Sequence, residues 1–261
     1  MVSGRHGRGV GQWSRTAAMV HARPMDTRPR TSLVTGANRG LGLEASRQLL
    51  ARGDHVLAAC RDPGHAHALN ALAGEHPGRL HVLPLDVGDA RSRAALAAEL
   101  PLVLGDDARI GLLLNNAGVL HSGERFGKLG EANLEHSFRV NAMGPLLLTQ
   151  ALEPRLAEGA RGVNVSSRLG SIGLVERFGT PSYAISKAAL NMATALLAQA
   201  LAARGIIVVA VSPGWVRTDM GGEAAELEPA DAVAALLGRV DALGEGDSGR
   251  FIGTDGQTIP W

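Results

Sequence analysis

Residues 31–42 read Thr31-Ser32-Leu33-Val34-Thr35-Gly36-Ala37-Asn38-Arg39-Gly40-Leu41-Gly42. The apolar run at 32–34 predicts a short buried strand, and the apolar spacing over 41–50 predicts a helix. Glycines between a strand and a helix let the backbone turn tightly and approach a pyrophosphate, whose charge is favourable at a helix N-terminus. The spacing is G-x-x-x-G-x-G rather than G-x-G-x-x-G. The loop alone could be only a tight turn, but the strand before it and the helix after it favour a dinucleotide site.

The same alternation of strand and helix continues to the end of the chain. Strands near-continuously apolar and separated by helices predict one parallel sheet covered on both faces, a doubly wound α/β domain of about seven strands. Residues 31–261 are expected to form this single domain. The expected strands are 32–34, 55–60, 80–83, 110–114, 162–166, 206–211 and a weak one at 249–252. The expected helices are 41–50, 66–73, 90–100, 131–156 with a bend at Pro145, 183–203 and 231–237.

Polar or glycine-containing segments follow most of these strands. In parallel sheets, ligands bind at the carboxyl ends of the strands. Gly36, Asp86, Asn115, Ser167 and Pro213 all fall at such ends. These positions are therefore the first candidates for a binding site.

Tyr183 and Lys187 lie four residues apart, and four-residue spacing on a helix places side chains on one face. Tyr183 is the only tyrosine, and Lys187 is one of two lysines, the other being Lys128. An ammonium group beside a phenol favours the phenolate and lowers the phenol pKa from about 10. The pair is a candidate general acid/base, although in isolation so short a pattern is more often structural.

Composition excludes several classes of function. The formal net charge of +1 argues against a nucleic-acid-binding domain. Cys60 is the single cysteine, which excludes an intrachain disulfide and favours a reducing, cytoplasmic setting. No apolar run is expected to span a membrane, the longest candidate being 142–152. The histidines show no metal-ligand spacing with cysteines or acids, so no metal site is expected.

Residues 1–30 differ from the rest in carrying six arginines, four glycines and one acid, Asp26. They show no helical or strand period and no apolar segment typical of a secretory signal. We expect either a disordered tail or a misassigned start, with Met25 near the true start.

Taken together, the motifs resemble those of the short-chain dehydrogenase/reductase family over about residues 31–261. The narrower resemblance is to its sniffer-like or C-factor-like carbonyl reductase branch. The residues that carry the resemblance are Thr35 to Gly42, Asp86, Asn115-Asn116-Ala117-Gly118, Asn141, Ser166 to Ile172, Tyr183-x-x-x-Lys187, Pro213 to Gly222, and the ending Gly249-Arg250-Phe251 with Asp255-Gly256 and Pro260-Trp261.

The resemblance implies a carbonyl reduction in which Tyr183 protonates the substrate oxygen, Lys187 holds the nicotinamide ribose and Ser167 bonds the carbonyl. Asn141 would position a water next to Lys187. Ser166 is the alternative to Ser167, because neighbours on a strand point to opposite faces. The implied cofactor-binding residues are Gly36, Asn38, Arg39, Gly40, Leu41, Gly42, Arg61, Asp86, Val87, Asn115, Ala117, Gly118, Tyr183, Lys187, Pro213, Gly214, Val216 and Thr218.

The end of the second strand favours NADP(H) over NAD(H). Enzymes that use NAD place an acid there, whereas those that use NADP place arginine nearby for the 2′-phosphate. Here Cys60 stands where the acid would be, Arg61 follows, and Arg39 lies in the glycine loop. Two guanidinium groups suit a dianionic phosphate, unless Asp62 neutralises Arg61.

The substrate is expected to be a small apolar carbonyl compound, because Leu120, Leu174, Trp215 and Met220 should line the pocket. The glycine-rich excursion from Ser167 to Tyr183 is expected to form one wall. The family also implies a homodimer through the 131–156 and 183–203 helices, or a tetramer. The alternative function is a dinucleotide-binding signalling or redox-sensing protein of C-factor type with little turnover.

Overall fold

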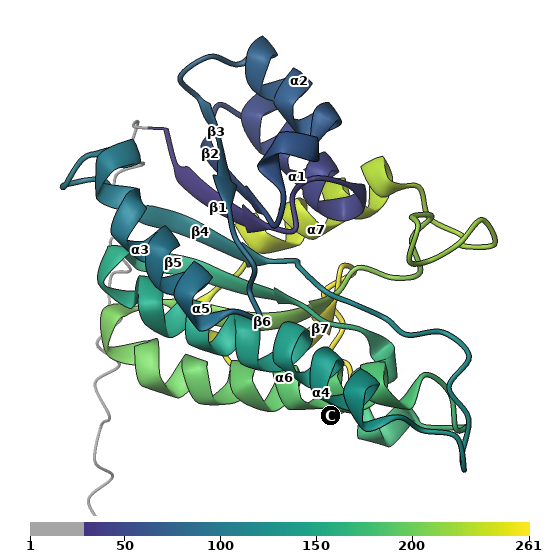
Figure 1. Ribbon diagram of the computed structural model, residues 1–261. Helices are drawn as coiled ribbons and strands as arrows, with labels where there is room; N and C mark the ends of the chain where they lie inside the picture. The colour runs from purple at the N-terminus through teal and green to yellow at the C-terminus, as the bar shows by residue number, and fades with distance from the viewer. Residues whose placement is uncertain (1–28) are drawn as a thin grey trace, which may run out of the picture.

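The computed structural model describes residues 29–261, which form one parallel sheet of seven strands with helices on both faces (Figure 1). The predicted fold class is confirmed. The strands are β1 (Thr31–Thr35), β2 (His55–Cys60), β3 (Leu80–Pro84), β4 (Ile110–Asn115), β5 (Leu156–Val165), β6 (Ile207–Ser212) and β7 (Phe251–Gly253). The main helices are α1 (Gly40–Ala51), α2 (His67–Glu75), α3 (Ala90–Leu104), α4 (Glu131–Phe138), α5 (Gly144–Leu152), α6 (Pro181–Leu201) and α7 (Pro229–Asp241).

Successive strand residues point into two separate cores, which is why the strands read as continuous apolar runs. Val34 and Ala58 lie in the core beneath α1, α2 and α7. Their neighbours Leu33 and Leu57 lie in the core beneath α3, α5 and α6. Figure 1 shows these two helical layers on opposite sides of the sheet. All four side chains are fully buried.

The strand order β3-β2-β1-β4-β5-β6-β7 positions the functional site. The chain moves outward from β1 through β2 to β3, then returns to place β4 on the other side of β1. The connections that leave β1 and β4 therefore run in opposite directions and open a crevice at the carboxyl ends of these two strands. Ligands of open α/β sheets bind in such a crevice.

The prediction of one long helix over 131–156 is wrong in the middle of the segment and at its end. The helix is divided by a π turn, Arg139–Met143, and Leu156 already belongs to β5. Pro145 has no N–H, so it cannot donate the usual helical hydrogen bond four residues back, and it lies in the first turn of α5 instead. The wide turn directly before it carries Asn141.

Helix α6, rather than the 142–152 stretch, is the longest apolar segment in the described part of the chain. Within residues 29–261, the helical stretch Pro181–Arg204 is the one long and apolar enough, by length and composition, to cross a membrane. Half of its apolar window is buried against the rest of the protein. Its buried face carries Lys187, Asn191 and Thr194, which bond to sheet residues and loops.

The expected disordered tail covers residues 1–30, and residues 1–28 lie outside the described part of the chain.

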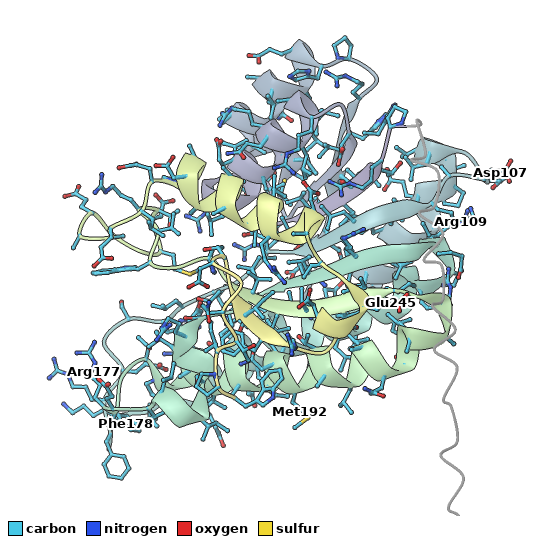
Figure 2. The ribbon with its side chains drawn as sticks, turned by 180° about the vertical axis from the view of Figure 1, so that it is seen from behind. Asp107, Arg109, Arg177, Phe178, Met192 and Glu245 are labelled. Carbon is cyan, nitrogen blue, oxygen red and sulfur yellow. The ribbon has the colours of Figure 1, made fainter. Side chains whose placement is uncertain are left out.

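Two long connections flank the site: residues 116–130 after β4, and residues 166–180 after β5. The second contains two short 3-10 turns, Arg168–Gly170 and Ile172–Leu174. Figure 2 shows its Arg177 and Phe178 projecting away from the sheet.

Candidate active site

The glycine loop makes a tight turn between β1 and α1. Gly36 and Gly40 have φ values of 64° and 54°, a left-handed conformation that suits glycine. Gly42 has a different role, because a Cβ there would lie 2.2 Å from the Gly36 carbonyl oxygen. Gly42 therefore permits close packing of helix on loop, and it does not line the cleft described next.

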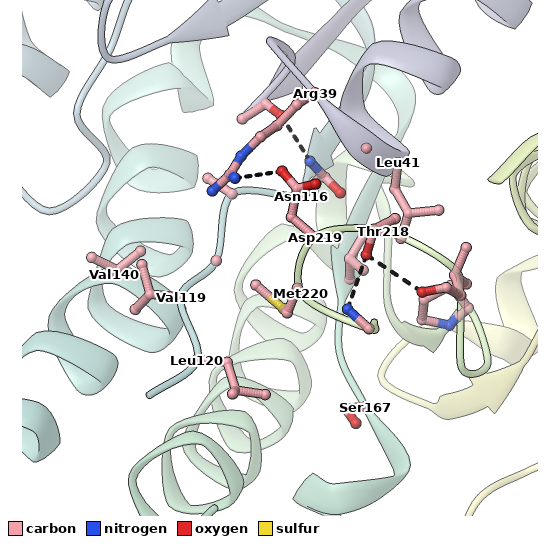
Figure 3. A pocket seen from close by; sticks show the side chains of 18 of the residues that line it. Arg39, Leu41, Asn116, Val119, Leu120, Val140, Ser167, Thr218, Asp219 and Met220 are labelled. Carbon is pink, nitrogen blue, oxygen red and sulfur yellow. Dashed lines mark hydrogen bonds and ion pairs between the residues drawn. The ribbon is translucent and has the colours of Figure 1, made fainter. Parts of the chain in front are cut away.

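A cleft of about 560 Å³ opens at the carboxyl ends of β1 and β4 (Figure 3). The N-terminus of α1 faces it, and the N-cap residue of α1, Arg39, makes no side-chain capping bond. The first backbone N–H groups of α1 are thus available to an anion. The predicted residues that line the cleft are Gly36, Asn38, Arg39, Gly40, Leu41, Arg61, Asp86, Val87, Ala117, Gly118, Ser167, Tyr183, Lys187, Pro213, Gly214, Val216 and Thr218.

Asn115 is buried in the sheet and does not line the cleft. Its amide nitrogen donates to Asn164 Oδ1 at 2.9 Å and to Thr149 Oγ1 at 3.3 Å. The lining residue is its neighbour Asn116, which sequence reasoning did not assign to the site. Asn116 Nδ2 donates to the Thr35 carbonyl oxygen at 2.9 Å and thereby ties the end of β4 to the end of β1. Strand alternation could have distinguished the two asparagines, because only one of them faces the crevice.

Asn141 is also outside the lining and fully buried. From the π turn its Oδ1 accepts from the Val119 N–H and its Nδ2 donates to the Val119 carbonyl, both at 2.8 Å. Nδ2 also donates to Ser186 Oγ at 2.9 Å. This side chain therefore fixes the segment after β4 against α6. The expected water-positioning role stays a prediction.

Arg39 and Arg61 both line the cleft, and their role in holding a cofactor phosphate stays a prediction. Arg39 Nη1 lies 2.7 Å from Asp219 Oδ2, and Figure 3 shows this ion pair among the residues that line the cleft. Both side chains are exposed, so the pair contributes little stability and an incoming phosphate can compete for Arg39. Asp62 hydrogen-bonds His65, and this bond lowers the Asp62 pKa. Among residues 29–261, Asp62 makes no ion pair with Arg61.

Cys60 is buried at the end of β2, and burial raises its thiol pKa. Only 2% of its surface is exposed. A raised pKa disfavours the thiolate, the form in which cysteine acts as a nucleophile. This side chain therefore contributes packing and leaves the neighbouring arginines as the polar groups at this strand end.

Tyr183, Ser167 and Lys187 meet on the floor of the cleft. Tyr183 lies in the first turn of α6, with 8% of its surface exposed. Lys187 follows one turn later, its Nζ 5.5 Å from the centre of the Tyr183 ring and 2.7 Å from the Val165 carbonyl oxygen to which it donates. Ser166, the alternative to Ser167, points to α6 and donates to Asn191 Oδ1 at 2.7 Å. Ser167 is the serine that lines the cleft beside Tyr183 and acts to lower the Tyr183 pKa.

The expected lowering of the Tyr183 pKa does not occur in this structure. Burial raises the pKa of Tyr183 to about 12, and the hydrogen bond from Ser167 offsets this only in part. Burial also lowers the pKa of Lys187 to about 8. The reason is that removal from water disfavours both charged forms, and the Lys187 ammonium group is directed to a backbone carbonyl rather than to the phenol oxygen.

The apolar lining agrees in part with the sequence prediction. Leu120, Trp215 and Met220 line the cleft, whereas Leu174 lines a second, smaller cleft beside β7. Of the excursion after β5, Leu169 reaches the main cleft, and Val175 and Phe178 line neither. Lining residues that sequence reasoning missed are Leu85, Asn116, Val119, Val140, Val165, Leu169, Asp219 and Gly221. Most are apolar or loop residues without a recognisable spacing.

Within residues 29–261, no group of three or more His, Cys, Asp or Glu side chains is arranged to hold a metal ion. The groups that gather in the cleft are instead a helix N-terminus, two arginines and a phenol with a hydroxyl and an amine beside it. An open parallel sheet with this glycine-lined crevice defines the Rossmann-type class of α/β proteins.

Comparison with known proteins identifies the family within that class. Residues 30–229 match the family described as short chain dehydrogenase. The chain belongs to this oxidoreductase family, as the motif resemblance implies.

Three relatives illustrate the likeness. The C-signal of Myxococcus xanthus is 40% identical over 154 residues, which are 58% of this chain and 93% of that protein. The NADPH-bound carbonyl reductase from chicken fatty liver has a TM-score of 0.84 and 37% identity, and the carbonyl reductase Sniffer of D. melanogaster has 0.85 and 32%. Each match covers 90% of this chain and 100% of the other. Relatives of both the C-factor and the sniffer type are thus confirmed.

Proposed function

We propose that this chain reduces an aldehyde or ketone to an alcohol with NADP(H), and that Tyr183 is the general acid. The observation that carries the proposal is the gathering of Tyr183, Ser167 and Lys187 on the floor of a cleft whose other end holds Arg39 and Arg61. The likeness to an NADPH-bound carbonyl reductase supports it. We further propose that residues 31–261 act as one catalytic domain.

The cleft fits a phosphorylated dinucleotide. Gly36 and Gly40, with the uncapped N-terminus of α1, would hold the pyrophosphate. Arg39 and Arg61 would hold the 2′-phosphate, because two guanidinium groups match a dianion. When bound, the cofactor would supply a hydride to the carbonyl carbon. NAD(H) would leave both arginines without a phosphate partner.

The protein groups would act on the carbonyl oxygen, which becomes negative as its carbon is reduced. The Ser167 hydroxyl would donate a hydrogen bond to this oxygen, and Tyr183 would deliver a proton to it. With a pKa raised to about 12, the Tyr183 phenol is protonated at neutral pH. That is the form needed in the direction of reduction. Lys187, behind the ring, would stabilise the phenolate left after transfer.

The substrate we propose is a small apolar carbonyl compound. Leu120, Trp215 and Met220 provide apolar surface at the substrate end of the cleft, with Val119 and Leu169. Apolar walls with a few convergent polar groups are typical of small-molecule sites. The single buried cysteine is compatible with action in the reducing cytoplasm.

The test is NADPH consumption with a panel of aldehydes, ketones and quinones. Wild type should turn over apolar carbonyls, and Tyr183→Phe should lose at least about 100-fold in kcat, the scale of general acid catalysis. Arg39→Ala should raise the KM for NADPH by about tenfold, because a charged hydrogen bond to the phosphate is lost. The KM for NADH should stay nearly unchanged. Comparable KM values for the two cofactors in wild type would contradict the NADP(H) proposal.

The relative named C-signal favours a second candidate, a dinucleotide-binding signalling or redox-sensing protein with little turnover. The same assay separates the two. If NADPH binds with micromolar affinity and no carbonyl in the panel is reduced, the sensor function replaces the enzyme. Retention of Tyr183 and Lys187 beside Ser167 supports the enzyme, because a sensor needs no proton donor.

We also propose a homodimer through α4, α5 and α6. Ile185, Met192 and Leu196 are 55%, 63% and 59% exposed and share one face of α6. Figure 2 shows Met192 projecting away from the sheet. Light scattering should give twice the chain mass for wild type, and Met192→Arg should shift it toward a monomer. A fourfold mass would indicate a tetramer, and a wild-type monomer would refute the proposed dimer.

A further inference from the structure

The first turn of α6 carries the reacting phenol, but the sequence around it supplies no cap. Thr180, the N-cap residue, makes no side-chain capping bond. Its φ of 41° is left-handed, the one such value at a non-glycine position in the described part of the chain. N-cap residues normally adopt extended backbone, from which a threonine hydroxyl reaches the first turn. The usual local cap is therefore absent three residues before Tyr183.

The missing cap comes from Glu124, in the connection after β4. Glu124 Oε2 accepts hydrogen bonds from the backbone N–H of Ser182 at 3.1 Å and from the Ser182 hydroxyl at 2.8 Å. Glu124 lies 58 residues before Ser182 in the chain. A carboxylate at a helix N-terminus satisfies an otherwise free N–H and interacts favourably with the helix dipole.

Two further contacts attach the same turn to its surroundings. Ser137 of α4, fully buried, donates from Oγ to Ser182 Oγ at 3.2 Å. Phe126 and Phe178 pack edge to face with ring centres 5.6 Å apart, joining the Glu124 segment to the loop that precedes α6. Ser182 is thus held from two sides, and the residue that follows it is Tyr183.

We propose that Glu124 is a positioning residue: by capping α6 from the connection after β4, it fixes the helix turn that places the Tyr183 phenol in the cleft. This inference rests on the proposed function of Tyr183. A helix terminus without a cap frays, and proton transfer needs the donor within hydrogen-bond reach of the oxygen. Leu120, which lines the cleft, precedes Glu124 by four residues. The connection after β4 therefore both lines the cleft and contacts the helix turn that carries Tyr183.

The proposal makes reach, rather than charge, the property that matters at position 124. Glu124→Gln keeps an oxygen at the same reach but removes the charge. Glu124→Asp keeps the charge but withdraws the oxygens by one methylene. Glu124→Ala removes both. Glu176→Ala is the matched control, because Glu176 is an exposed carboxylate in the loop before α6 with no hydrogen bond to the described residues.

The variants are compared by carbonyl reduction with NADPH, with NADPH affinity measured separately by fluorescence. Glu124→Ala and Glu124→Asp should lose about tenfold or more in kcat, the scale expected from misplacing an acid, with NADPH affinity within twofold of wild type. Glu124→Gln and Glu176→Ala should stay within threefold of wild-type kcat, an interval set by the modest net value of one hydrogen bond. The reverse order, Asp active and Gln inactive, would overturn the proposal and indicate a role for charge.

A second measurement does not need turnover and keeps the inference separate from the proposed function. Tyr183 is the only tyrosine, so tyrosinate absorbance reports its ionisation alone. A looser first turn of α6 should admit water to Tyr183. In an alkaline titration, the midpoint of Tyr183 ionisation in Glu124→Ala should therefore fall toward the ordinary tyrosine value of about 10, while Glu124→Gln keeps the wild-type midpoint. Unchanged midpoints in Ala and Asp variants would refute the positioning role even if no substrate is found. If Glu124→Ala does not fold, the Asp and Gln pair decides.

Discussion

The single tyrosine makes one prediction directly measurable. Raising the pH of the cofactor-free protein should ionise Tyr183 only near pH 12, because burial disfavours the phenolate. The ordinary tyrosine value is about 10, and two pKa units correspond to about 3 kcal/mol of differential stabilisation. Since the folded state holds the proton more tightly, this contribution to stability is present below pH 10 and is lost as pH rises from about 10 to about 12.

The assay is ultraviolet absorbance of tyrosinate during alkaline titration, with circular dichroism recorded on the same samples. In denaturant the midpoint should return to about 10. Ser167→Ala should move it further upward, because the Ser167 hydrogen bond stabilises the phenolate. Tyr183→Phe should show no transition. A midpoint at or below 10 in the folded wild type would refute the reasoning and show that the Lys187 charge outweighs burial.

Three further variants test the energetics of the site. Lys187→Met should abolish turnover yet raise the free energy of unfolding at pH 7 by about 2 kcal/mol, because burial lowers the Lys187 pKa to about 8 and the lost bond to Val165 offsets part of the gain. The unfolded chain binds the Lys187 proton more tightly than the folded protein, so the free energy of unfolding of wild type should rise between about pH 8 and 10.5. The stability advantage of Lys187→Met over wild type should therefore disappear across this pH range. An advantage that persists above pH 10.5 would contradict the assignment. Gly42→Ala should cost at least about 2 kcal/mol in denaturant titrations and weaken NADPH binding, because its Cβ would meet the Gly36 carbonyl; wild-type stability would show that the loop relaxes freely. Thr180→Gly should stabilise the protein by about 1 kcal/mol in thermal unfolding, since glycine adopts a φ of 41° without strain; a loss would mean that the threonine side chain contributes contacts.

Much of the fold follows from the sequence, because burial of both sheet faces leaves a direct pattern. Leu33 and Val34 are adjacent and both apolar, and each fills a different core. The interrupted helix was not predictable from the same pattern. Apolar periodicity does not distinguish an α turn from a π turn, and Leu156 continues the apolar run although it belongs to β5.

The site was predictable where a residue's role depends on its place at a strand end, and not where it depends on distant partners. Ser167 and Tyr183 are drawn together by the fold as expected. The direction of the Tyr183 pKa depends on how deeply the cleft buries it, which spacing along one helix does not reveal. The capping of Ser182 by Glu124 joins residues far apart in sequence. Neither glutamate nor serine stands out by type at those positions.

The π turn at Arg139–Met143 makes α4 and α5 one helix with a change of phase. One extra residue in a turn offsets everything after it by about 100° relative to a regular helix. Before the turn, Ser137 faces α6; after it, Leu148 faces the sheet core. Deletion of a single residue here would straighten the helix and rotate one of these faces away from its partner. Insertions and deletions in this segment should therefore be far less tolerated than substitutions.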